Sequence, residues 1–78
     1  MLTEQQLLML IARYETQTGP VNWYRLRHWD QEIPISPNAT LRALAAKGWL
    51  EAVPERAEGW YRLTAEGWNV VEKVNENS

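Results

Sequence analysis

The chain has 78 residues, a formal net charge of −2 and a pI near 5.3, so we expect residues 1–78 to form one small domain with a marginal core. It contains no cysteine and a single histidine, His28, which excludes disulfides, thiolate metal sites and His-rich metal sites. No segment resembles a signal peptide or approaches the roughly 18 apolar residues of a membrane span, so we expect a cytoplasmic protein without a membrane partner.

The first predicted helix begins after Thr3 and ends at Gly19 and Pro20. Thr3 and Gln6 have the spacing of a capping box, in which each side chain bonds to the other residue's backbone. Apolar residues then recur at helical spacing, namely Leu7, Leu8, Ile11 and Tyr14. The pattern predicts an amphipathic helix with one buried face.

A short second helix is predicted after Asn22, which is suited to cap it. Leu26 and Trp29 fall on one side of this helix. Its basic residues fall mostly on the other sides, and they are Arg25, Arg27 and His28. Pro34 keeps the residue before it extended, so the helix ends upstream, and the connection over 31–35 is expected to place its isoleucines in the core.

The third predicted helix spans residues 36–48. Ser36 at the N-cap and Pro37 at the first helical position are a strong start signal, and Gly48 suits the left-handed conformation that ends a helix. At about 100° per residue, one face is apolar and buried, formed by Leu41, Leu44, Ala45 and Gly48. The opposite face carries Ala39, Ala43 and Ala46.

Two strands and a final helix complete the pattern. Residues 49–53 and 60–63 are rich in aromatic and aliphatic residues and read as a hairpin, with Pro54 and Gly59 bracketing its turn. Thr64 is placed to cap the last helix, whose buried face continues through Val71 and Val74. Residues 75–78 are expected to fray.

The residues around the hairpin resemble a known family. They are Leu41, Leu44, Lys47, Gly48, Trp49 and Leu50, followed by Tyr61, Leu63, Thr64 and Gly67. This pattern resembles the winged helix-turn-helix domain of bacterial transcriptional regulators of the MarR and PadR type. The resemblance implies an α+β fold: a three-helix core, a two-stranded hairpin as the wing, and a C-terminal helix. It also implies that residues 36–48 are the recognition helix and residues 54–59 the wing of a bacterial or phage regulator.

The resemblance makes double-stranded DNA the expected partner, with helix 36–48 in the major groove. Asn38 and Arg42 have groups for bidentate contacts to bases, and alanines such as Ala39 can touch a thymine methyl. Ser36, Thr40 and Lys47 border the same face and suit phosphates. The backbone contacts would come from Arg25, Arg27 and His28 on the second helix and from Arg56 and Arg62 on the wing. For each arginine, an ordinary solvated charge is the alternative interpretation.

The charge distribution gives arguments in both directions. An acidic chain is not expected to bind DNA strongly without sequence specificity. Residues 22–48 nevertheless carry Arg25, Arg27, Arg42 and Lys47 against Asp30 and Glu32, which leaves a surplus of positive charge there. In the predicted wing, Glu55 and Glu58 flank Arg56, and these carboxylates would repel a phosphate backbone.

A protein-binding winged helix is therefore the alternative function. The strip of Ala39, Ala43 and Ala46 is a flat apolar surface suited to a protein partner. Exposed tryptophans would be anchors of the same kind, against the alternative that tryptophan fills the core in place of the absent phenylalanine. The five candidates are Trp23, Trp29, Trp49, Trp60 and Trp68. A small phage or plasmid accessory factor would fit this size.

Catalysis and cofactors are not expected. Ser36 is better explained as a helix cap than as a nucleophile, His28 is expected at the surface, and no glycine-rich phosphate loop is present. A homodimer is expected because one small acidic domain makes too few contacts for useful DNA affinity, whereas two half-sites would share the task. The first or the last helix would have to supply the dimer contact.

Overall fold

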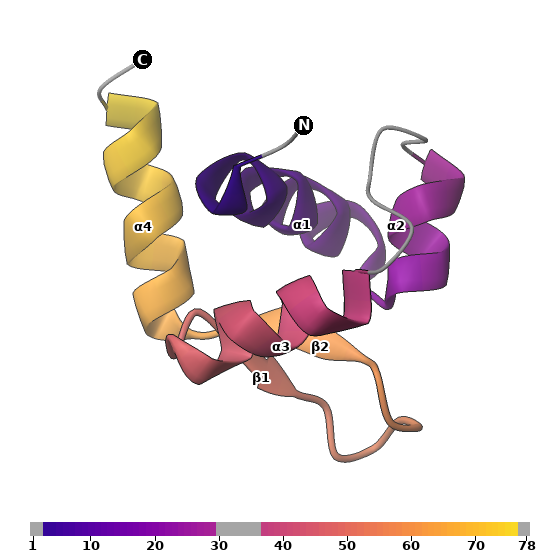
Figure 1. The fold of residues 1–78 in the computed structure, drawn as a ribbon. Helices are drawn as coiled ribbons and strands as arrows, with labels where there is room; N and C mark the ends of the chain where they lie inside the picture. The colour runs from indigo at the N-terminus through magenta and orange to yellow at the C-terminus, as the bar shows by residue number, and fades with distance from the viewer. Residues whose placement is uncertain (1–2, 30–36, 77–78) are drawn as a thin grey trace.

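The computed structural model describes residues 3–29 and 37–76, with only the backbone described for Trp29, Pro37 and Asn38. These residues form a mixed α+β structure with four helices and a two-stranded sheet (Figure 1). In chain order the elements are α1 (Glu4–Thr18), α2 (Trp23–Trp29), α3 (Pro37–Ala46), β1 (Leu50–Ala52), β2 (Tyr61–Leu63) and α4 (Ala65–Glu76). None of the described helices is long and apolar enough to cross a membrane.

Helix α1 begins with the predicted capping box. The backbone N–H of Gln6 donates to the Thr3 hydroxyl at 3.1 Å, and the N–H of Thr3 donates to the Gln6 side-chain oxygen at 2.9 Å. The two bonds satisfy donors that a helix start otherwise leaves open. At the other end Gly19 ends the helix, as predicted, and its N–H donates to the carbonyl of Glu15 at 2.8 Å.

The link between α1 and α2 joins the sheet, which was not predicted. Val21 and Tyr61 form an antiparallel bridge in which each N–H donates to the other's carbonyl, at 3.0 and 2.8 Å. Val21 therefore pairs along β2 on the edge away from β1. Immediately afterwards the Asn22 side chain accepts from the N–H of Arg25 at 2.9 Å, which confirms the predicted cap of α2.

Helix α3 packs its predicted face inward. Leu41 and Leu44 are fully buried and Ala45 is half-buried, while Ala39, Ala43 and Ala46 are exposed as predicted. The helix ends at Ala46, two residues before the predicted end, because residues 47 and 48 already form a turn. Gly48 has φ of +84°, the left-handed conformation predicted for it. The predicted cap Ser36 and the connection over 31–35 lie outside the described residues.

The hairpin pairs Leu50 with Leu63, Glu51 with Arg62, and Ala52 with Tyr61. Both strands are shorter than the predicted 49–53 and 60–63. One further bond, from the N–H of Val53 to the carbonyl of Trp60 at 3.1 Å, continues the ladder. Pro54 follows directly and has no N–H to donate, so pairing stops there.

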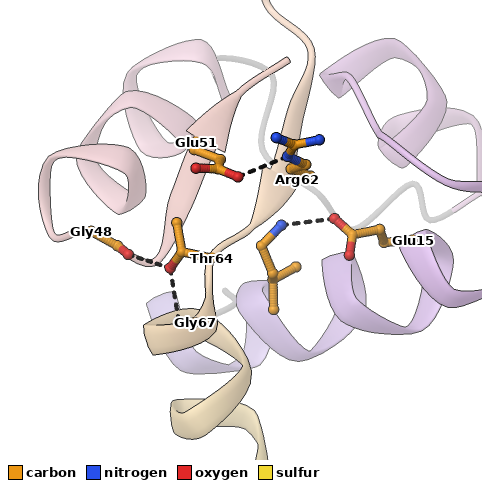
Figure 2. A network of polar contacts seen from close by, with 7 residues as sticks. Glu15, Gly48, Glu51, Arg62, Thr64 and Gly67 are labelled. Carbon is orange, nitrogen blue, oxygen red and sulfur yellow. Dashed lines mark hydrogen bonds and ion pairs between the residues drawn. The ribbon is translucent and has the colours of Figure 1, made fainter.

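Thr64 joins the hairpin to α4 (Figure 2). Its hydroxyl donates to the carbonyl of Gly48 and accepts from the N–H of Gly67 at 3.0 Å, which confirms the predicted cap. The prediction that the chain frays from residue 75 was wrong for residues 75 and 76, which belong to α4. Asn75 lines the same hollow as Gln6 and Met9 of α1, so the last turn lies against α1.

The core lies where α1, α3, the hairpin and α4 meet. Its fully buried side chains are Leu8, Ile11, Val21, Leu26, Leu41 and Leu44. The four tryptophans whose side chains are described are neither core nor exposed: Trp23, Trp49, Trp60 and Trp68 are all half-buried. Aliphatic side chains therefore fill the centre, and Trp23, Trp49 and Trp68 pack against it.

Candidate nucleic-acid interface

A groove of about 490 Å³ lies between the start of α2, the middle of α3 and the loop of the hairpin. We call it the aromatic groove; it is lined by Asn22, Trp23, Tyr24, Arg42, Ala57, Glu58, Gly59, Trp60 and Tyr61. Figure 1 shows why three elements contribute, because the hairpin extends past α3 on the side of the molecule where α2 lies. The Val21–Tyr61 bridge joins the residue before α2 to β2, and so brings the start of α2 beside the hairpin.

Two arginines contact the indole ring of Trp60 in this groove. The guanidinium carbon of Arg56, from the hairpin loop, lies 4.5 Å from the ring centroid. That of Arg25, from α2, lies 5.2 Å from the same ring. Cation–π contacts of this kind contribute about 0.5–1 kcal/mol at exposed sites. They bring two positive charges that are 31 residues apart in sequence to one edge of the groove.

Tyr24 forms a second aromatic element of the groove. Its ring stacks on that of Trp23, with centroids 4.8 Å apart and planes inclined by 23°. Its side chain is 72% exposed, the one large hydrophobic residue so exposed among those described. On its other flank Tyr24 borders a hollow of about 560 Å³ together with Thr18, Arg25 and His28. Tyr24 thus borders two hollows, one lined by Arg42 and the other by Arg25 and His28.

The candidate residues of α3 lie on its outer surface. Arg42 is exposed and lines the aromatic groove, and Ala39 is exposed on the same helix. Thr40 is half-buried. Ser36 and the side chain of Asn38 lie outside the described residues. Of the two residues predicted to make bidentate contacts to bases, only Arg42 can therefore be placed on the surface of α3.

Lys47 and Arg62 are engaged in ion pairs outside the aromatic groove. Lys47 pairs with Glu4 of α1, and its ammonium lies 5.0 Å from the ring centroid of Trp49. The Arg62 side chain donates to the Glu51 carboxylate at 2.7 Å across the hairpin (Figure 2). This hydrogen bond to Glu51 raises the pKa of Arg62 above its usual value.

A second polar contact ties α1 to the hairpin near this ion pair. The Glu15 carboxylate accepts from the backbone N–H of Leu63 at 2.7 Å (Figure 2). Burial raises the pKa of Glu15, and its effect outweighs the opposing influence of the Leu63 N–H and of the Arg62 charge. This carboxyl group completes the backbone pairing of β2, which gives it a structural role.

The remaining candidates and the acidic residues complete the surface. His28 is exposed and Arg27 is half-buried on α2. Glu58 lines the aromatic groove, and Glu55 is exposed in the same loop. The lining of the groove itself holds one arginine, Arg42, and one carboxylate, Glu58, while Arg25 and Arg56 lie beside it against Trp60.

Within residues 3–29 and 37–76, no group of three or more His, Cys, Asp or Glu residues is arranged to hold a metal ion. A further hollow of about 610 Å³ lies between α1 and α4, with Met9, Leu10, Trp68 and Val71 among its lining residues.

No family model, no curated protein and no solved structure matches this chain.

The sequence pattern names the basic residues as candidates, and their role in binding stays a prediction. The pattern gives Trp60 only as one of five possible anchors, and no prediction concerns Tyr24. The signal that points to them is the alternation of aromatic and basic residues at Trp23-Tyr24-Arg25, with Arg56 and Trp60 in the hairpin. The contact between these two segments depends on the Val21–Tyr61 bridge, for which the local pattern gives no indication.

Proposed function

We propose that residues 1–78 form a winged-helix domain, similar to those of MarR- and PadR-type regulators, that binds specific DNA sequences in transcriptional control. The order of helices and hairpin supports this fold. Val21, in the link between α1 and α2, pairs with Tyr61 and so adds one residue beside β2 as a third, minimal strand. In this proposal α3 enters the major groove and the loop between β1 and β2 follows the DNA backbone. The protein acts in the cytoplasm, and no catalytic step or cofactor is assigned to it.

The observation that carries the proposal is the convergence of Arg25, Arg42 and Arg56. They come from α2, α3 and the hairpin loop, and all lie at the aromatic groove or on its Trp60 wall. A surface that combines an exposed helix with cations beside it suits a DNA duplex, whose phosphate backbones flank the major groove. Arg42 is the base-reading candidate, and Arg25 and Arg56 are the phosphate contacts.

The other basic candidates have weaker support. Lys47 and Arg62 already neutralise Glu4 and Glu51, so moving them to phosphates would break an existing ion pair. Because both pairs are exposed, that cost is small, at about 0–1 kcal/mol each. We assign them secondary contacts at most, because neither is among the residues that line the aromatic groove, and they provide matched controls for the arginines at the groove.

A homodimer is part of the proposal, because two half-sites supply the contacts that one small acidic domain lacks. Helices α1 and α4 are the elements assigned to the contact. They pack against each other on the side of the molecule away from α2 (Figure 1), and half-buried apolar side chains line the hollow between them. Sedimentation equilibrium with and without DNA measures this directly.

One observation favours the second function, a winged helix that binds a protein. The exposed strip of Ala39, Ala43 and Ala46 gives α3 a flat apolar surface that suits a partner helix as well as a base-pair edge. In-vitro selection from random duplex DNA separates the two functions. Enrichment of a palindromic site supports the DNA reader, whereas no enrichment at about 50 mM salt, where phosphate contacts are strong, supports the protein partner.

A further inference from the structure

Tyr24 has no role in reading an intact duplex, yet it is the most exposed large apolar side chain described. One face of its ring is covered by Trp23. The high exposure of the side chain leaves the other face open to solvent. An aromatic ring fixed by a stacked neighbour and open on one face is a platform for another flat ring.

The surroundings of this ring select the kind of ligand. Trp60 lines the aromatic groove together with Tyr24, and Arg25 and Arg56 lie against the Trp60 ring at the edge of the groove. Arg42 lines the groove itself from α3. A ligand that stacks on Tyr24 therefore has one cation in the groove and two more beside Trp60. A nucleotide has both parts, a flat base and an anionic phosphate. The groove volume of about 490 Å³ falls within the range of about 300–1,000 Å³ typical of small-ligand sites.

We propose that the aromatic groove binds an unpaired nucleotide of a DNA strand, with its base stacked on Tyr24 and its phosphate held by Arg25 and Arg56. This site deepens the DNA-binding function proposed above and rests on it. It makes the protein prefer DNA with an unpaired base, such as a bulge or a single-stranded end beside a duplex, over a fully paired duplex of the same sequence.

Glu58 is the one acidic residue among those that line the groove. A carboxylate repels a phosphate placed beside it, so Glu58 weakens binding of an anionic ligand in this groove. Glu58→Gln removes the repulsion and is expected to strengthen binding of the unpaired strand.

The test is fluorescence anisotropy with three labelled DNAs at about 50 mM salt: a paired duplex, the same duplex with one unpaired nucleotide, and a single strand. The parent protein is expected to bind the bulged duplex at least about fivefold more tightly than the paired one, the low end of base stacking on an aromatic ring. Tyr24→Ala is expected to abolish this preference, so that the variant binds the bulged and the paired duplex with affinities within about twofold of each other. Tyr24→Phe keeps the ring and is expected to keep the preference.

The outcomes separate this site from the function it rests on. Paired-duplex binding without a preference for the bulge overturns the site and leaves the duplex reader intact. Tyr24-dependent binding of the single strand without duplex binding supports the site and overturns the duplex reader. A free nucleoside monophosphate that competes at equal strength assigns the groove to a soluble nucleotide and overturns the strand proposal. Groove binding by a proline-rich peptide, with none by DNA, also overturns it.

Discussion

The backbone N–H of Leu63 in β2 donates its hydrogen bond, 2.7 Å long, to the side chain of Glu15 in α1 (Figure 2). On one edge β2 pairs with β1, and on the other with Val21 through Tyr61. The Leu63 N–H lies beyond the reach of the Val21 bridge, and a carboxylate from a helix takes the place of a strand. Glu15 thus fixes how α1 sits against the hairpin.

Replacing Glu15 by Gln tests the electrostatic part of this contact. Because burial raises the pKa of Glu15 in the fold, the folded protein holds this proton to higher pH than the unfolded chain does. The stabilisation linked to this group is therefore full below the unfolded pKa, near 4.3 for Glu, and is lost as pH rises through the raised pKa. Gln keeps an acceptor for Leu63 and does not titrate, so its stability relative to the parent should rise between about pH 4 and pH 7.

Urea unfolding at several pH values measures this difference. Asn69→Ala on the exposed face of α4 is the control, and because neither residue titrates, its difference from the parent should not depend on pH. A Glu15→Gln difference that falls with rising pH would contradict the assigned direction of the pKa shift.

Replacing Glu15 by Leu tests the hydrogen bond itself. The substitution removes the acceptor and leaves the partly buried N–H of Leu63 without a partner, which costs about 1–3 kcal/mol of unfolding free energy. Glu15→Gln should avoid most of that loss at pH 7. Equal stability of the Leu and Gln variants there would show that the Leu63 bond contributes nothing measurable.

Gly67 permits a close approach between α4 and the start of the hairpin. A Cβ added there would lie 2.1 Å from the carbonyl oxygen of Trp49. Helix propensity alone predicts that Gly67→Ala stabilises the protein by about 0.5–1 kcal/mol. The contact predicts the opposite sign, a loss of about 1–3 kcal/mol or more, because the helix must move away from backbone atoms.

Thermal unfolding of Gly67→Ala, with Asn69→Ala on the exposed side of the same helix as control, decides between the two signs. The control should change stability by no more than about 0.5 kcal/mol. A Gly67→Ala protein that melts at or above the parent temperature would mean that α4 shifts without cost.

Gly48 is held at φ of +84°, and a Cβ there would come 3.0 Å from the Glu66 carboxylate. Gly48→Val should therefore destabilise the fold by roughly 1 kcal/mol or more, since a β-branched residue resists positive φ. Gly48→Asn should lose less, because Asn tolerates the left-handed region better. Chemical denaturation of the pair measures the difference, and an unaltered midpoint for the Val variant would rule out the strain.

Arg42→Ala tests the base-reading assignment. On a selected site the variant should lose about 1–3 kcal/mol of binding free energy and relax specificity at one position. Arg62→Ala is the matched control, since Arg62 lies on β2 and is not among the residues that line the aromatic groove, and it should lose clearly less. Repeating the selection with each variant gives both readouts. Equal losses for the two variants would mean that Arg42 supplies charge alone.

Local signals in the sequence determined most of the elements. The capping box at Thr3, the cap at Asn22, the turn at Gly48 and the cap at Thr64 were all predicted, because each depends on residues within a few positions of one another. The resemblance motif has a physical basis in the structure. The Thr64 hydroxyl donates to the Gly48 carbonyl and caps α4 by accepting from the N–H of Gly67. Gly67 in turn lies close to the backbone of Trp49.

Apart from the exact ends of some elements, the missed features are contacts between distant segments. Glu15 and Leu63 are 48 residues apart, and Val21 pairs with Tyr61 although it follows a helix rather than a strand pattern. No periodicity within a short window reports such pairings. The same reason applies to the candidate site. Arg25 and Arg56 are predicted singly as basic residues, but their shared contact with Trp60 joins segments that are distant in the sequence.

The most direct measurement is the affinity for a selected duplex at about 50 and 200 mM salt, for the parent and for Arg25→Ala, Arg56→Ala and Arg62→Ala. DNA binding through the aromatic groove predicts a steep fall in parent affinity with salt. It also predicts a slope reduced by about one for Arg25→Ala and for Arg56→Ala, and an unchanged slope for Arg62→Ala. No binding of the parent at about 50 mM salt, or equal slopes for all four proteins, would contradict it.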